Sequence, residues 1–170
     1  VCSSDLMNST VSQIWIYPIK SLAGCKVEEV DFTERGLALD RRWMLVDITG
    51  QFITQRQFPI LSQLIVIIQS EQLLIHPKYD LTNLCSIPLS LPTDTPSIEV
   101  SVWEDLLSAQ LGPDSAHVWF SKLLQTEVRL VYMPDTSKRY VNPKYAFHQE
   151  IVHFSDGYPV LVISEESLSE

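Results

Sequence analysis

The chain has 170 residues, of which 45% are hydrophobic and 19% charged, a composition typical of one globular domain, alone or with part of a second. Its 12 basic and 21 acidic residues give a net charge of −9, which disfavours general binding to nucleic acid. The three cysteines show no CxxC pair and no zinc-ligand spacing, and no apolar run is long enough to span a bilayer. The sequence therefore predicts no membrane segment and a cytoplasmic, reducing location.

The first six residues read VCSSDL, and Met7 follows directly. This hexapeptide is the translation of a commonly used sequencing adaptor. We therefore expect residues 1–6 to be non-native and to make no packed contacts, and the native protein to begin at Met7.

Short β-type segments dominate the chain up to residue 103. Alternating or β-branched apolar residues predict strands at 11–19, 27–32, 43–48, 60–69, 73–75, 87–91 and 98–103. A tight turn over residues 47–50 is expected to return residues 51–56 antiparallel to the strand at 43–48. Short strands at this spacing are typical of a small barrel or sandwich.

One helix is expected to interrupt this β pattern, beginning near Pro113, which suits a first helical position, with Asp114 in its first turn. Apolar residues at i, i+3, i+4, i+7 and i+8 form one face; they are Ala116, Trp119, Phe120, Leu123 and Leu124. A strand over residues 127–133 and a polar loop over 134–149 follow. The predicted fold class is mainly β with one or two helices (α+β).

The final stretch, YPVLVISEESLSE, predicts a strand at 160–163 that leads into a helix capped by Ser164. We interpret it as the start of a second domain whose body is missing, with a boundary near residues 140–150. On this interpretation the apolar face of the segment is exposed. The alternative is a short C-terminal helix that closes the first domain.

The segment IYPIKSLAG (residues 16–24) ends its strand pattern at Pro18 and places Lys20 and Ser21 directly after it. One interpretation is a solvated turn, since turns favour polar residues. The other is an anion site, in which a rigid corner presents an ammonium group, a hydroxyl and free backbone N–H groups.

Three arginines flank the predicted hairpin. Arg41 and Arg42 enter its first strand and Arg56 leaves its second, so all three are expected at one end of the hairpin, together with Lys20. Guanidinium groups suit phosphate and other oxyanions. Surface charges that happen to flank turns remain the alternative.

Four blocks, in this order, resemble the N-terminal β-barrel domain and the first elements of MOSC-domain proteins. The blocks are IYPIKSLAG, RGLALDRRWMLVD, GQFITQRQFPILSQL and FSDGYPVLVISEESLSE. They are similar to the bacterial molybdenum-cofactor proteins of the amidoxime-reducing group and to their mitochondrial counterparts. The resemblance implies a barrel domain over residues 7–145 and the truncated start of a MOSC domain over 146–170.

The resemblance also implies that a molybdenum cofactor (molybdopterin) lies between the barrel and the MOSC domain, only partly enclosed by this chain. It assigns the pterin phosphate to Lys20, Ser21 and Arg41, and we expect neither Lys20 nor Arg41 to be a core residue. Arg56 is a supporting cation. A further set of candidate contacts opens the MOSC domain, and its members are Gly157 and Tyr158.

The cysteine that ligates molybdenum in this family is expected beyond Glu170, so we assign no metal ligand and no catalytic residue to this chain. Cys25 and Cys85 match no ligand position and are interpreted as ordinary small residues, with Cys85 buried. The complete protein is expected to reduce N-hydroxylated or N-oxygenated compounds, with electrons from a fused iron–sulfur domain or a separate reductase. This part alone is expected to be inactive.

Two other hypotheses stay open. In the first, the chain is a non-catalytic β-barrel module that binds a phosphorylated ligand or partner. In the second, it is part of a molybdenum-cofactor sulfurase or sulfur-carrier protein. A pyridoxal-phosphate domain fused before Met7 would favour the sulfurase. An authentic stop codon after residue 170 would favour the binding module.

Overall fold

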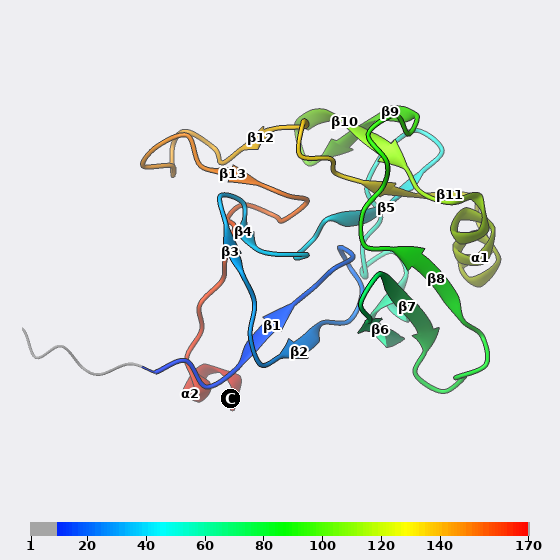
Figure 1. Ribbon diagram of the computed structural model, residues 1–170, viewed down its shortest axis with the longest axis horizontal. Helices are drawn as coiled ribbons and strands as arrows, with labels where there is room; N and C mark the ends of the chain where they lie inside the picture. Colours follow the sequence, from blue (N-terminus) through cyan, green and yellow to red (C-terminus); the bar gives the residue numbers. More distant parts are fainter. Residues whose placement is uncertain (1–9, 170) are drawn as a thin grey trace, which may run out of the picture.

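Two antiparallel sheets contain most of the strand residues in the computed structural model of the protein, which describes residues 10–169 (Figure 1). The larger sheet has the order β5-β11-β10-β9; its strands are Trp43–Asp47, Val128–Tyr132, Asp105–Leu111 and Ser97–Val102. The smaller sheet has the order β6-β7-β8; its strands are Leu64–Ile68, Gln72–Pro77 and Cys85–Pro88. The mainly β fold class expected from the sequence is confirmed.

Three short antiparallel ribbons complete the β structure within the described residues. They pair β1 (Ile14–Ile16) with β2 (Cys25–Val27), β3 (Phe32–Thr33) with β4 (Gly36–Leu37), and β12 (Arg139–Tyr140) with β13 (Ile151–Val152). A parallel bridge between Ile19 and Trp43 joins the segment after β1 to the larger sheet.

Strand β5 is buried on both faces and separates two hydrophobic cores. Side chains alternate along a strand, so Trp43 and Leu45 enter one core, while Met44 and Val46 enter the other. The first core lies against the smaller sheet and the helix α1, and the second lies against β9 and β10. Burial on both faces explains why β5 reads as a continuous apolar run in the sequence.

The helix expected after residue 113 is confirmed as α1 (Asp114–Leu124), which packs beside β11 and β8 (Figure 1). Pro113 is the N-cap and not the first helical residue. The predicted apolar face points inward, with Ala116, Phe120 and Leu124 buried. No helix among residues 10–169 is long and apolar enough to cross a membrane.

Several strand predictions differ from the structure. Residues 51–56 do not form a full second hairpin strand: Phe52 bridges Val46, and the N–H of Ile53 donates to the carbonyl of Leu45 (2.9 Å). Gln51 makes a further bridge, to Ser101 of β9. The pairing with β5 ends there because residues 18–20 bond to Trp43 on the same edge of the strand. A 3-10 helix takes residues Pro59–Gln63, so β6 starts later than expected. Strand β10, whose sequence DLLSAQL does not alternate regularly between apolar and polar residues, was not predicted.

The segment 160–163 is not a strand, since no strand within residues 10–169 pairs with it. Leu161 and Val162 are 81% and 88% exposed, so the apolar exposure expected here is confirmed. Ser164 caps the short helix α2 (Glu165–Leu168), where its hydroxyl accepts a hydrogen bond from the backbone N–H of Ser167. Residues 1–6 lie outside the described residues, and the boundary near 140–150 stays a prediction.

The turn of the β3–β4 ribbon requires a glycine. Gly36 has a φ of +97°, and a Cβ added there would lie 2.7 Å from the carbonyl oxygen of Pro159. We expect Gly36→Ala to lower the free energy of unfolding by about 1–3 kcal/mol, through backbone strain and this clash. Gly157→Ala is the matched control, since a Cβ at that position would meet no atom of the described residues within 4 Å. Equal losses in urea unfolding of the two variants would contradict this reading of the turn.

Candidate functional site

The candidate site lies where the segment after β1 meets the entry to β5. The backbone N–H of Lys20 donates to the carbonyl of Trp43 (2.8 Å), and that of Trp43 donates to the carbonyl of Pro18 (3.0 Å). The N–H of Arg41 donates to the carbonyl of Tyr17 (2.7 Å). These bonds place Lys20 and Arg41 on adjacent stretches of backbone, although 21 positions separate them in the sequence.

Two of the predicted site residues adopt a left-handed backbone conformation. Ser21 has a φ of 72° and Arg41 a φ of 50°, which is uncommon for residues other than glycine and persists only where the surroundings hold it. The Ser21 hydroxyl donates to the carbonyl of Ile53 (2.9 Å), and its own carbonyl accepts from Gln55 Nε2 (2.8 Å). Arg56 is exposed in the turn that contains Gln55, and it makes no hydrogen bond or ion pair with any described residue.

Lys20 is more buried than the sequence indicated, with only 6% of the residue exposed. Its Nζ lies 2.7 Å from Asp156 Oδ1 and 5.3 Å from the centroid of the Phe52 ring. Burial lowers the pKa of Lys20, and the charges of Arg139 and Arg41 lower it further, against the opposing effect of Asp156. The site thus holds a buried ammonium group next to two guanidinium groups.

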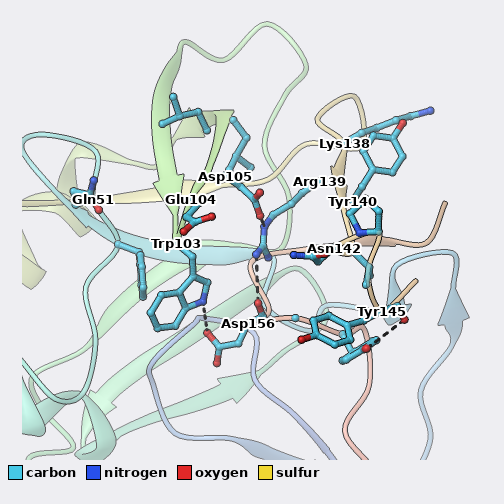
Figure 2. Close-up of a pocket in the computed structure, with 17 residues that line it drawn as sticks. Gln51, Trp103, Glu104, Asp105, Lys138, Arg139, Tyr140, Asn142, Tyr145 and Asp156 are labelled. Carbon is cyan, nitrogen blue, oxygen red and sulfur yellow. Dashed lines mark hydrogen bonds and ion pairs between the residues drawn. The ribbon is translucent and has the colours of Figure 1, made fainter. Parts of the chain in front are cut away.

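Asp156 supplies the negative charge next to Lys20, yet its side chain is 75% exposed. The same Oδ1 accepts a hydrogen bond from Trp103 Nε1 (3.2 Å; Figure 2). Burial by itself would raise the pKa of Asp156, but Lys20 and Trp103 outweigh it and the pKa lies below its ordinary value. The Asp156 carboxylate therefore occupies a position where an oxyanion is favoured, and it reaches that position from the solvent side.

Arg139 fixes the loop that carries Asp156. Its residue is 6% exposed, and its Nε lies 2.7 Å from Asp105 Oδ2, at the start of β10. The rest of the guanidinium group donates to backbone carbonyls of the loop; these belong to His153, Ser155 and Asp156. Figure 2 shows this guanidinium group between Asp105 and the loop.

A cavity of about 880 Å³ opens beside this loop and includes the last two predicted site residues. Gly157 and Tyr158 line it, as do Asp156, Arg139 and Trp103 (Figure 2). The Tyr158 hydroxyl donates to the carbonyl of Tyr145, another residue of the lining (3.3 Å). Among the other predicted residues, Lys20 reaches the cavity only through Asp156, and the lining does not include Ser21, Arg41 or Arg56.

Two buried polar atoms near the site, Arg41 Nε and Ser155 Oγ, have no hydrogen-bond partner among the described residues. Nη2 of the same guanidinium group contacts the Asp40 carboxylate and the carbonyl of Pro159. Unpaired buried donors are rare in folded proteins. Together with the ammonium group of Lys20, they suit an anion with several acceptor oxygens, such as a phosphate group.

The described cysteines do not add a reactive group. Burial raises the pKa of both Cys25 and Cys85 to about 11, so both thiols are protonated at neutral pH. Cys85 is buried, as expected, and Cys25 Sγ donates to the carbonyl of Val66 (3.0 Å). Within residues 10–169 no group of three or more His, Cys, Asp or Glu side chains is arranged to hold a metal ion.

Sequence reasoning missed three residues of this site. Asp156 stands inside the block FSDGY but carries no feature that separates it from a loop aspartate, and Trp103 was read only as the end of a strand. Arg139 fell in the segment taken as a polar loop. A buried arginine has no sequence signature of its own, since arginine is mostly exposed in proteins.

The structure is thus a mainly β domain in which Lys20, Arg41 and Arg139 contact the loop at residues 153–159. The family model of the MOSC N-terminal beta barrel domain matches residues 8–127, and the chain belongs to this family. The matched range includes Lys20, Ser21, Arg41 and Arg56, whereas Gly157 and Tyr158 lie beyond it.

The relatives that this chain matches fall into two groups. It is 31% identical to mitochondrial amidoxime-reducing component 1 of Mus musculus and 33% identical to component 2 of Rattus norvegicus, covering 95% and 94% of this chain, respectively, and 49% of each relative. It is 29% identical to the molybdenum cofactor sulfurase of Oryza sativa, over 94% of this chain and 20% of that protein. The chain thus spans about half the length of the amidoxime-reducing relatives. The family model and these identities confirm the family expected from the sequence.

Proposed function

We propose that this chain forms the N-terminal part of a molybdenum-cofactor oxidoreductase and holds the phosphate side of the cofactor. Lys20 and Arg41 would bind the phosphate group through charge-assisted hydrogen bonds, with Ser21 as a neighbouring donor. Gly157 and Tyr158 would face the cofactor from the loop at the cavity, and Arg56 would add positive charge at the rim. The cofactor supplies the redox chemistry when bound; these residues bind and orient it.

The observation that carries this proposal is the pairing of a buried ammonium group with an exposed carboxylate. Lys20 is 6% exposed and its partner Asp156 is 75% exposed. A buried charge is stable only when it is paired, and here the partner reaches in from solvent. A phosphate group can take the place of the Asp156 carboxylate without leaving Lys20 unpaired.

The substrate class follows from the relatives named for amidoxime reduction. This chain matches about half the length of each of them. We propose that the whole protein reduces N-hydroxylated compounds, with electrons from a fused iron–sulfur domain or a separate reductase, and that residues 146–170 open its second domain. The cytoplasmic location stays a prediction, since the mouse and rat relatives are named as mitochondrial.

The test uses the protein encoded by the uninterrupted reading frame that contains this chain. We expect Lys20→Met and Arg41→Met each to weaken cofactor binding by about 1.5–3 kcal/mol, which is tenfold or more, because each loses a charge-assisted phosphate contact. The molybdenum content of the purified protein measures this loss. Lys122→Met, at an exposed lysine of α1, is the control and is expected to keep the molybdenum content of the wild type.

Folding can be separated from binding at the same position. Methionine keeps the buried aliphatic stem of Lys20, and the partner left behind, Asp156, is 75% exposed and returns to water, so that no buried charge is left unpaired. We therefore expect the free energy of unfolding of Lys20→Met to stay unchanged or to rise. Wild-type molybdenum content in both Lys20→Met and Arg41→Met would show that the phosphate lies elsewhere.

A second candidate function is supported by the rice relative, a molybdenum cofactor sulfurase that this chain matches over 94% of its own length. In that case the chain would be part of a sulfurase, and a pyridoxal-phosphate domain would precede it in the reading frame. The same anion site would then hold a molybdenum cofactor as a substrate or ligand, so the two candidates differ in the neighbouring domains and not in the role of Lys20.

A further inference from the structure

A second cavity, of about 470 Å³, shares no lining residue with the cavity of the candidate site. It lies between the β3–β4 ribbon, the entry to β5 and the end of β11. Its lining brings together two arginines, a histidine and a tyrosine, which are Arg35, Arg42, His153 and Tyr132. The proposed function uses none of them.

Arg35 is buried where an arginine is normally exposed. It occupies the turn of the β3–β4 ribbon, yet only 4% of the residue is exposed. Its Nη2 donates to the carbonyl of Asp135 (2.8 Å), and its Nη1 lies 3.6 Å from Met133 Sδ. No carboxylate within residues 10–169 forms an ion pair with it. The charges of Asp135 and Glu34 act on it favourably without direct contact. A buried guanidinium group without a direct counter-charge is unfavourable unless something else supplies that charge.

Arg42 places a second guanidinium group in the same cavity. Its Nη1 lies 2.6 Å from Asp135 Oδ1 and 3.2 Å from His153 Nε2, and its Nη2 donates to the Tyr132 hydroxyl. The guanidinium carbon lies 4.7 Å from the centroid of the Tyr132 ring. Its own side chain is 13% exposed, whereas that of Asp135 is 85% exposed.

The interior of this cavity is therefore positive and its rim is acidic. Both guanidinium groups are buried or nearly so, while the two carboxylates of the lining, from Glu34 and Asp135, belong to exposed residues. Burial and the neighbouring charge of Arg42 lower the pKa of Arg35, and the opposing charges of Asp135 and Glu34 do not outweigh them. Like charges that remain buried together call for an anion between them.

We propose that this cavity is a second anion-binding site, which takes the phosphate group of a small molecule between Arg35 and Arg42 once the Asp135 carboxylate moves aside. Each planar guanidinium fork matches two phosphate oxygens, and a dianion balances two cations where Asp135 balances one. The volume suits a small phosphorylated compound.

The experiment titrates the chain with inorganic phosphate at constant ionic strength and pH 7.5, and follows two NMR signals. The His153 ring reports the second site, because its Nε2 contacts Arg42. The Trp103 indole N–H reports the first site, because it contacts Asp156. We expect the His153 signal to shift with saturation, and acetate at the same ionic strength to shift it at least tenfold more weakly.

Variants assign that response to the cavity. Arg35→Gln is expected to weaken the His153 response at least tenfold, and Lys20→Met is expected to leave it unchanged, so failure at one site is distinguishable from failure at the other. Asp135→Asn removes the competing carboxylate from an exposed position, and we expect phosphate to bind severalfold more tightly. Glu127→Gln, which removes an exposed carboxylate paired with Arg129, is its control and is expected to have no effect.

A His153 signal that does not respond to phosphate would overturn the proposal. So would a response that persists in Arg35→Gln, or an Asp135→Asn variant that binds phosphate no more tightly than the wild type. Asp135→Asn keeps the test decisive even if Arg35→Gln fails to fold, since Asp135 is exposed and its removal leaves both guanidinium groups in place.

Discussion

Arg139→Gln is expected to lower the free energy of unfolding by about 3 kcal/mol, more than any other single polar substitution suggested by this structure. Arg139 is 6% exposed, and its guanidinium group joins Asp105 to three backbone carbonyls of the loop at residues 153–156. Glutamine is too short to reach all of them, so buried carbonyls lose their donor. Asp105 is 49% exposed and regains solvent, which keeps the loss at the lower end of the range for buried charged groups.

Urea unfolding at pH 7 measures this loss, and Arg129→Gln provides the matched control. Arg129 pairs with Glu127 at 3.8 Å, with side chains that are 38% and 70% exposed, so its removal is expected to change stability by about 0–1 kcal/mol. The Arg139 variant should also shift the indole N–H signal of Trp103, because Asp156 loses its fixed position. A loss in Arg139→Gln no larger than in Arg129→Gln would show that the loop is held by other contacts.

The second large expected effect concerns how the free energy of unfolding depends on pH. Burial, together with the charges of Arg42 and Arg35, lowers the pKa of His153 to about 3. The contact with Arg42 Nη1 requires His153 Nε2 to accept a hydrogen bond, so the ring is neutral in the folded protein. Asp135, also nearby, acts in the opposite direction and does not outweigh the two arginines.

The direction of this pH dependence follows from proton binding in the folded and the unfolded chain. Between pH 6.5 and about 3 the unfolded chain binds a proton at His153 and the folded chain does not. The contribution of His153 to the free energy of unfolding is therefore complete above pH 6.5. It is lost as the pH falls, by up to about 1.4 kcal/mol per pH unit. We expect the free energy of unfolding to fall by about 2 kcal/mol between pH 7 and pH 5 through this one residue.

His153→Gln tests this expectation, since the glutamine amide oxygen can still accept a hydrogen bond from Arg42 but does not titrate. The fall between pH 7 and pH 5 should shrink by about 2 kcal/mol in this variant, measured by urea unfolding at each pH. His148→Gln, at an exposed histidine, should keep the slope of the wild type. If His153→Gln keeps that slope as well, the histidine is protonated in the folded protein.

The sequence by itself predicted a helix, a strand, the family and the cationic segment of this protein. The periodicity of 114–124 predicted α1, because one amphipathic face determines a helix locally. The block IYPIKS and the pair Arg41-Arg42 indicated the family and the cationic segment, because Pro18 and the charges beside it are local features. The strand at 43–48 was also predicted, although alternation alone does not show that β5 is buried on both faces.

Only the tertiary structure decided which charges meet. Lys20 and Asp156 are 136 positions apart, Arg139 contacts Asp105 across 34, and no local pattern encodes such pairs. It also decided that Lys20, Arg35 and Arg139 are buried, since arginine and lysine are mostly exposed and their sequence surroundings give no sign of the exception. The physical reason is the same in each case: strand pairing and packing bring distant loops together, and the charge, burial and pKa of a side chain depend on those neighbours and not on the residues beside it in the chain.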